Sequence, residues 1–64
     1  MIESGIAVQF LDKQVFVVRT DDGRDICSEG VITKVSPTAL LLEFRGRTQA
    51  ISLDSILNIR EATP

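Results

Sequence analysis

The sequence has no histidine, no tryptophan and no tyrosine, and it has a single cysteine, Cys27. Without histidine, no imidazole can act as a general acid, a general base or a metal ligand. One cysteine cannot form a disulfide within the chain, and it leaves zinc without a set of ligands. No nucleophile is paired with a base, and no glycine-rich phosphate loop is present. We therefore expect no enzymatic activity, no metal and no cofactor.

Long hydrophobic runs are also absent. The longest apolar runs have about four residues, whereas a membrane-spanning helix needs about 20 and a signal peptide needs a continuous apolar core. The sequence therefore predicts no membrane segment. Together with the unpaired cysteine, this favours a cytoplasmic, reducing location.

The chain has 64 residues, of which 44% are hydrophobic and 25% charged, as in a soluble globular protein. This predicts one domain over residues 1–64. A domain of this size buries only about 60% of its unfolded surface, and such domains often need disulfides, metals or oligomerisation for stability. Because the first two are excluded, we expect a homo-oligomer. The net charge of −2 argues against a general affinity for nucleic acid.

Residues 1–13 predict a short helix or an extended arm, with Ile6, Phe10 and Lys13 on one face if helical. Alternating and β-branched segments predict five strands within residues 14–60, followed by a tail at 61–64. The expected strands are 15–20, 24–35, 39–44, 48–53 and 56–60. Asp22-Gly23 is a strong hairpin signal, and Gly30 marks a bend inside the second strand. Short connections favour a strongly bent five-stranded antiparallel barrel of the SH3-like kind.

Several features resemble the Sm/LSm family, which includes Hfq. Asp22-Gly23-Arg24 stands where the family has its turn after the first strand, and Ser36 follows Gly30 by six residues. Ile32, the run 39–42 and residues 49–59 follow the family pattern in order. The resemblance covers residues 11–60. It implies a short N-terminal helix followed by a bent five-stranded barrel.

The resemblance also implies assembly and RNA binding. In the family, the fourth strand of one subunit pairs with the fifth strand of the next and closes a ring, here a homo-oligomer of about five to seven subunits. The residues that this contact would use are Gln49, Ile51, Leu53, Leu57 and Ile59. Family members bind single-stranded, uridine-rich RNA around the pore through the turns after strands two and four.

The chain departs from the family at the positions that contact RNA. Ser36 replaces the usual aspartate, Leu40 replaces the asparagine of many members, and residues 52–55 carry no basic side chain. The candidate RNA-binding residues are Lys34, Ser36, Thr38, Arg45, Arg47, Asp54 and Ser55. Each can also be explained by ordinary turn chemistry or by a solvated surface.

Other residues support simpler interpretations. We expect Cys27 to be a buried or half-buried small hydrophobe. The three phenylalanines, Phe10, Phe16 and Phe44, could stack on bases, but we expect them to belong to the core. The acidic residues of 21–29 lack the spacing of a calcium loop and indicate a solvated turn. The sequence thus predicts an Sm-like ring-forming protein with weak RNA-binding or RNA-chaperone activity. The alternative is a structural or protein-interaction ring that binds no RNA.

Overall fold

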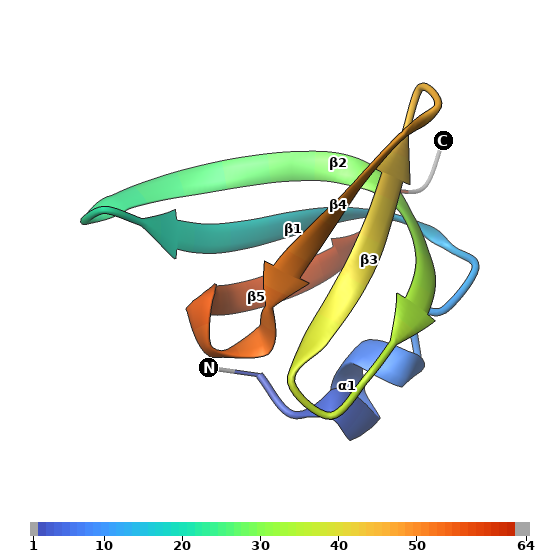
Figure 1. The fold of residues 1–64 in the computed structure, drawn as a ribbon, viewed down its shortest axis with the longest axis horizontal. Helices are drawn as coiled ribbons and strands as arrows, with labels where there is room; N and C mark the ends of the chain where they lie inside the picture. Colours follow the sequence, from blue (N-terminus) through green and yellow to red (C-terminus); the bar gives the residue numbers. More distant parts are fainter. Residues whose placement is uncertain (1, 63–64) are drawn as a thin grey trace.

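The computed structural model describes residues 2–62. One short helix precedes five strands, and a 3-10 turn separates the last two strands (Figure 1). The elements are α1 (Ser4–Val8), β1 (Gln14–Asp21), β2 (Arg24–Val35), β3 (Ala39–Phe44), β4 (Arg47–Ser52), η1 (Leu53–Ser55) and β5 (Ile56–Glu61). The five expected strands are confirmed. Leu53 belongs to η1 rather than to the fourth strand, and Glu61 belongs to β5 rather than to the tail. Met1 and residues 63–64 of the expected arm and tail lie outside the described residues.

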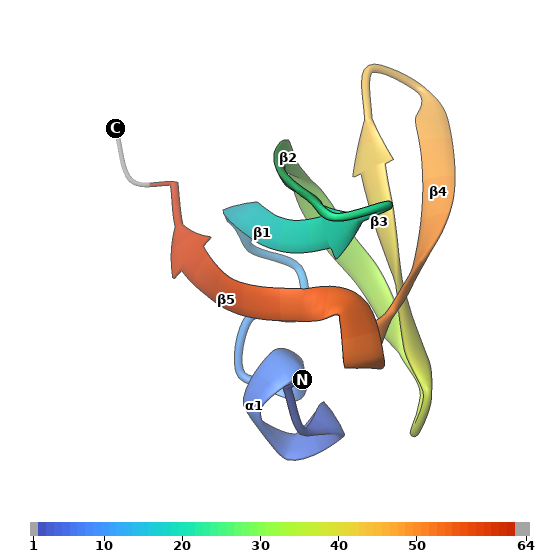
Figure 2. The same ribbon diagram turned by 90° about the vertical axis from the view of Figure 1, so that its left-hand side faces the viewer.

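The strands form one antiparallel sheet in the order β4-β3-β2-β1-β5. The expected antiparallel sheet is confirmed, but its closure into a barrel is wrong, because no ladder joins β4 to β5 in the described chain. The two halves of the sheet share only β2 and diverge from it, so the outer strands lie apart (Figure 2). The sheet therefore has two free edges, one on β4 and one on β5.

Two tight hairpins set the register of these halves. Asp22 and Gly23 connect β1 to β2 with φ values of 53° and 78°, and Arg45 and Gly46 connect β3 to β4 with 52° and 79°. Positive φ at both central residues is the geometry of a type I′ turn, whose twist matches that of paired strands. The glycine in each turn adopts this conformation without steric cost.

The long strand β2 bends at Gly30 and serves two partners. Its first part pairs with β1 up to Val31, and its second part pairs with β3 from Val31 onward. A Cβ atom at Gly30 would lie 2.6 Å from the carbonyl oxygen of Glu43 and 2.9 Å from Cγ of Leu42. Real Cβ atoms do not approach other atoms so closely, so the bend requires glycine at this position.

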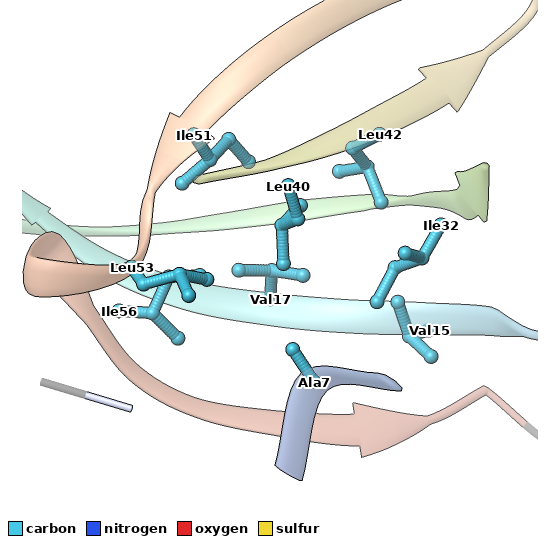
Figure 3. Close-up of a cluster of buried hydrophobic side chains, with 9 residues drawn as sticks. All are labelled: Ala7, Val15, Val17, Ile32, Leu40, Leu42, Ile51, Leu53 and Ile56. Carbon is cyan, nitrogen blue, oxygen red and sulfur yellow. The ribbon is translucent and has the colours of Figure 1, made fainter. Parts of the chain in front are cut away.

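Nine buried side chains fill the concave side of the bent sheet (Figure 3). They come from every strand, from η1 and from α1: Ala7, Val15, Val17, Ile32, Leu40, Leu42, Ile51, Leu53 and Ile56. The segment after α1 is attached to the sheet by the Asp12 N–H, which donates to the carbonyl of Ile32 at 2.7 Å. The helix therefore covers the core through one small residue, Ala7.

The residue of α1 that enters the core does not belong to the expected face. Ile6 is 44% exposed, whereas Ala7 is fully buried and Phe10 packs against the core. The N–H of Phe10 donates to the carbonyl of Ala7, three residues back, at 3.0 Å. In such 3-10 geometry, residues three apart share a face, so Phe10 packs with Ala7 against the core, and it also lines one groove with Ile6.

The expected burial of Cys27 is wrong, and that of the phenylalanines holds only for Phe10. Cys27 is exposed, because its register partner is Val18, on the side of β1 opposite to the core residues Val15 and Val17. Phe10 is half-buried and packs against the core, whereas Phe16 is half-buried without belonging to the core cluster and Phe44 is 39% exposed. No helix in residues 2–62 is long and apolar enough to cross a membrane.

Gly30→Ala should destabilise the protein, because the new Cβ would collide with the backbone of β3. Overpacking of this kind costs about 1–3 kcal/mol of unfolding free energy, which lowers Tm by about 4–8 °C per kcal/mol in a domain of this size. Gly5→Ala is the matched control, because a Cβ there meets no atom within 4 Å, and it should be neutral or stabilising. Thermal unfolding at equal protein concentrations tests both variants, and an unchanged Tm for Gly30→Ala would contradict the assignment of the bend.

Candidate functional site

The structure brings together the two turns that the resemblance associates with RNA. The N–H of Leu53, which opens η1, donates to the carbonyl of Thr38 in the β2–β3 turn at 2.9 Å. A pocket of about 450 Å³ lies where these turns meet the N-terminal segment. It is lined by Ile2, Glu3, Ser4, Pro37, Thr38, Ser52, Leu53 and Asp54. Of the predicted residues, Thr38 and Asp54 therefore share one pocket.

The hydroxyls of the two serines in these turns are used by the backbone. The Ser36 hydroxyl donates to the carbonyl of Ala39 at 3.0 Å, and Ser36 Oγ accepts the N–H of the same residue at 3.1 Å. The Ser55 hydroxyl donates to the carbonyl of Ser52 at 2.7 Å. These bonds hold the turns in shape and explain both serines without a ligand.

The charge of this pocket is negative. Among the described residues, its lining contains the carboxylates of Glu3 and Asp54 and no basic side chain. Lys34 is exposed on β2, where its register partner is Leu41. Carboxylates repel phosphate, so the pocket lacks the electrostatic attraction that supplies most of the affinity for nucleic acids.

The other two predicted basic residues lie at the far end of β3. Arg45 is in the β3–β4 turn and Arg47 begins β4, whereas Ser36 and Thr38 precede the start of β3 (Figure 1). The seven predicted residues thus form two separate groups. One group lies in or next to the β2–β3 and β4–β5 turns, with only Thr38 and Asp54 in the acidic pocket, and the other forms a basic hairpin tip.

The sequence predicted Phe44 to belong to the core, with base stacking as the alternative. Phe44 is 39% exposed, and the guanidinium carbon of Arg45 lies 5.1 Å from the centre of its ring. This is within the range of a cation–π contact. The available signal was the alternation of Leu40, Leu42 and Phe44 up to the last residue of the strand, since a side chain next to a turn is the first to lie beyond a small core.

The residues predicted for a subunit contact differ in their accessibility. Gln49 and Leu57 are exposed and Ile59 is half-buried. Ile51 and Leu53 are buried in the core of their own chain, at 1% and 3% exposure. The side chains of these two residues are therefore not available for a contact with another chain.

The acidic β1–β2 turn offers no assembled metal site. Within residues 2–62, no three histidine, cysteine, aspartate or glutamate side chains lie close enough together to hold a metal ion.

Comparisons with known proteins identify no relative. No family model matches the sequence, no curated protein matches it, and no solved structure matches the fold.

Ser36→Ala should lower the unfolding free energy by about 1 kcal/mol. The change removes the hydroxyl that donates to the Ala39 carbonyl and accepts the Ala39 N–H. Thr38→Ala is the control, since the Thr38 hydroxyl makes no hydrogen bond within the described chain. Urea unfolding measures both changes. Equal stability of the two variants would show that the Ser36 hydroxyl does not stabilise the turn.

Proposed function

We propose that this chain is an Sm-like subunit that assembles with copies of itself through its two free sheet edges and binds single-stranded RNA weakly. The observation that carries the proposal is the strand order. The two strands that the resemblance assigns to the subunit contact, β4 and β5, are the two outer strands of the sheet. An exposed edge strand is a template for pairing with another chain.

The register identifies the backbone groups that are free on β4. Phe44 and Arg47 flank the two-residue turn and form a hydrogen-bonded pair. Because such pairs alternate along an antiparallel ladder, Thr48 and Ala50 point their N–H and C=O groups away from β3. The same alternation applies to β5. The Ala62 N–H donates to the carbonyl of Gln14 on β1 at 2.8 Å. Glu61 and Ile59 therefore point their N–H and C=O groups away from β1.

An apolar groove beside β5 also supports self-association. It lies between α1 and β5, has a volume of about 580 Å³, and is lined by Ile2, Glu3, Ile6, Gln9, Phe10, Leu57, Asn58 and Ile59. Ile6 is 44% and Leu57 is 49% exposed. A strand from a second copy that pairs with β5 lies next to this groove and covers part of its apolar surface, which stabilises the assembly.

The contact between β4 and β5 joins two different surfaces, so it must close into a ring or continue as a filament. We propose a closed ring of about five to seven subunits. In a closed ring, every β4 edge and every β5 edge is paired. A small chain without disulfides needs this pairing for both stability and solubility.

The pocket at the two turns favours weak RNA binding or none. Its carboxylates, and the use of Ser36 and Ser55 by the backbone, remove the features that would hold a phosphate or a base tightly. The same observations support the second candidate function, a structural or protein-interaction ring.

Ala50→Pro tests the assembly. Proline removes the outward N–H of β4 without breaking the bond to β3, and edge strands tolerate it. After nuclease treatment, native mass spectrometry should show wild-type rings and mainly single chains of 7.0 kDa for the variant. Ala50→Ser, which keeps the N–H, should still form rings. A wild-type protein that sediments as a folded single chain at micromolar concentration would contradict the proposed assembly.

Wild-type protein should bind labelled oligo(U) weakly and prefer it little over oligo(A). The affinity should fall steeply between about 50 and 200 mM salt, because it depends on counterion release. Fluorescence anisotropy measures this binding. Tight, uridine-selective binding at high salt would show that the substituted turns still act as an Sm-type RNA site, and absence of binding at the lowest salt would favour the second candidate function.

A further inference from the structure

Phe44 is an aromatic residue on a core-facing row that extends beyond the core. Side chains alternate along β3, so Leu40, Leu42 and Phe44 share one face. Leu40 and Leu42 are each 1% exposed, but Phe44 is 39% exposed. Within the described chain the sheet stays open, and no strand covers this end of the hairpin. The phenyl ring of Phe44 is therefore partly exposed to solvent.

Polar groups surround this ring on the same side of the hairpin. Arg47 is the register partner of Phe44, and Gln49 is the partner of Leu42, so both project from the face that carries Phe44. Phe44, Arg47, Thr48 and Gln49 line a shallow pocket of about 350 Å³. Its volume is at the lower end of the range for small-ligand sites.

The positive charges at this tip have no acidic partner among residues 2–62. The single salt bridge in this range joins Lys13 to Glu61, so no carboxylate of the described chain neutralises Arg45 or Arg47. The nearest acidic residue in the sequence, Glu43, alternates with Phe44 and projects from the other face of the hairpin. Arg45 is instead stacked over Phe44. The tip therefore presents an aromatic ring and two guanidinium groups in one place.

We propose that the β3–β4 hairpin tip is a contact site for single-stranded nucleic acid. An unpaired base stacks on the Phe44–Arg45 pair, because bases stack on aromatic rings and on guanidinium planes. Arg47 and the charge of Arg45 bind the flanking phosphates. This site is distinct from the turns that the resemblance associates with RNA, which lie at the other end of β3.

The chemistry of the tip determines its selectivity. A phenyl ring stacks on every base, and guanidinium groups bind the phosphates of RNA and DNA equally. The site should therefore tolerate any base and either sugar, and it should reject duplexes, whose bases are already stacked on each other. It is built within one chain, so it does not require assembly. It rests on the proposed function only in that a ring would repeat the tip and raise the apparent affinity.

Two variants of the full chain separate stacking from charge, with anisotropy of labelled oligo(U), oligo(dT) and a duplex as the readout. Phe44→Leu keeps an apolar side chain but removes the ring, and it should weaken binding by about fivefold or more without changing the salt dependence. Arg45→Gln with Arg47→Gln should weaken binding and also reduce the salt slope by about 0.7 for each lost phosphate contact. Oligo(U) and oligo(dT) should bind wild-type protein about equally.

Arg24→Gln is the matched control. Arg24 follows the other type I′ turn, and the change should leave the affinity within about twofold of wild type. Circular dichroism and native mass confirm the fold and assembly of each variant. Wild-type affinity in both tip variants would overturn this site alone and leave the proposed function intact. No binding by wild-type protein would overturn this site and the RNA role together, whereas loss of rings would affect only the assembly.

Discussion

The close contact between Gly30 and the backbone of β3 is the constraint on which the architecture depends. The Glu43 carbonyl occupies the space that any side chain at residue 30 would need. This contact allows β2 to change direction and to pair with β1 on one side of the bend and with β3 on the other. The concave core, the two diverging hairpins and the separated outer strands are all consequences of that bend.

Because the hairpins diverge, each extends beyond the core and presents a tip of its own charge. The β1–β2 tip carries Asp21, Asp22 and Asp25 around one arginine, whereas the β3–β4 tip carries Arg45 and Arg47. The net charge of the whole sequence therefore does not describe the charge at either hairpin tip. A net charge of −2 is compatible with a local basic surface, and it is the local field within about 8–10 Å that a polyanion encounters at physiological salt.

Local chemistry made much of this fold predictable. Asp22-Gly23 and Gly46 specify tight turns, the β-branched and alternating runs specify strands, and Gly30 marks the bend. The errors concern features that depend on distant parts of the chain. Ile6 was grouped with Phe10 and Lys13 on one face of a possible helix, but Ala7 is the helix residue that enters the core. Sheet closure depends on how two hairpins meet, which no short segment encodes.

The candidate site was predictable to a similar degree. The sequence indicates which residues lie in turns, so Ser36, Asp54 and Arg45 could be named. It does not indicate that the Ser36 hydroxyl is already used or that β3 separates the arginines from the other turns. Phe44 was assigned to the core because aromatic residues usually lie there. The structure is needed to show that the core ends before Phe44.

The pairing of the first strand with the last also determines the order in which this protein can fold. The β1–β2 and β3–β4 hairpins join neighbouring residues, so each can form as soon as its own segment is available. The β1–β5 ladder joins Val15 to Glu61, and such long-range pairing is slow because the loop must close first. The proposed assembly needs a β5 edge as well as a β4 edge, so it can close only after β5 has folded onto β1.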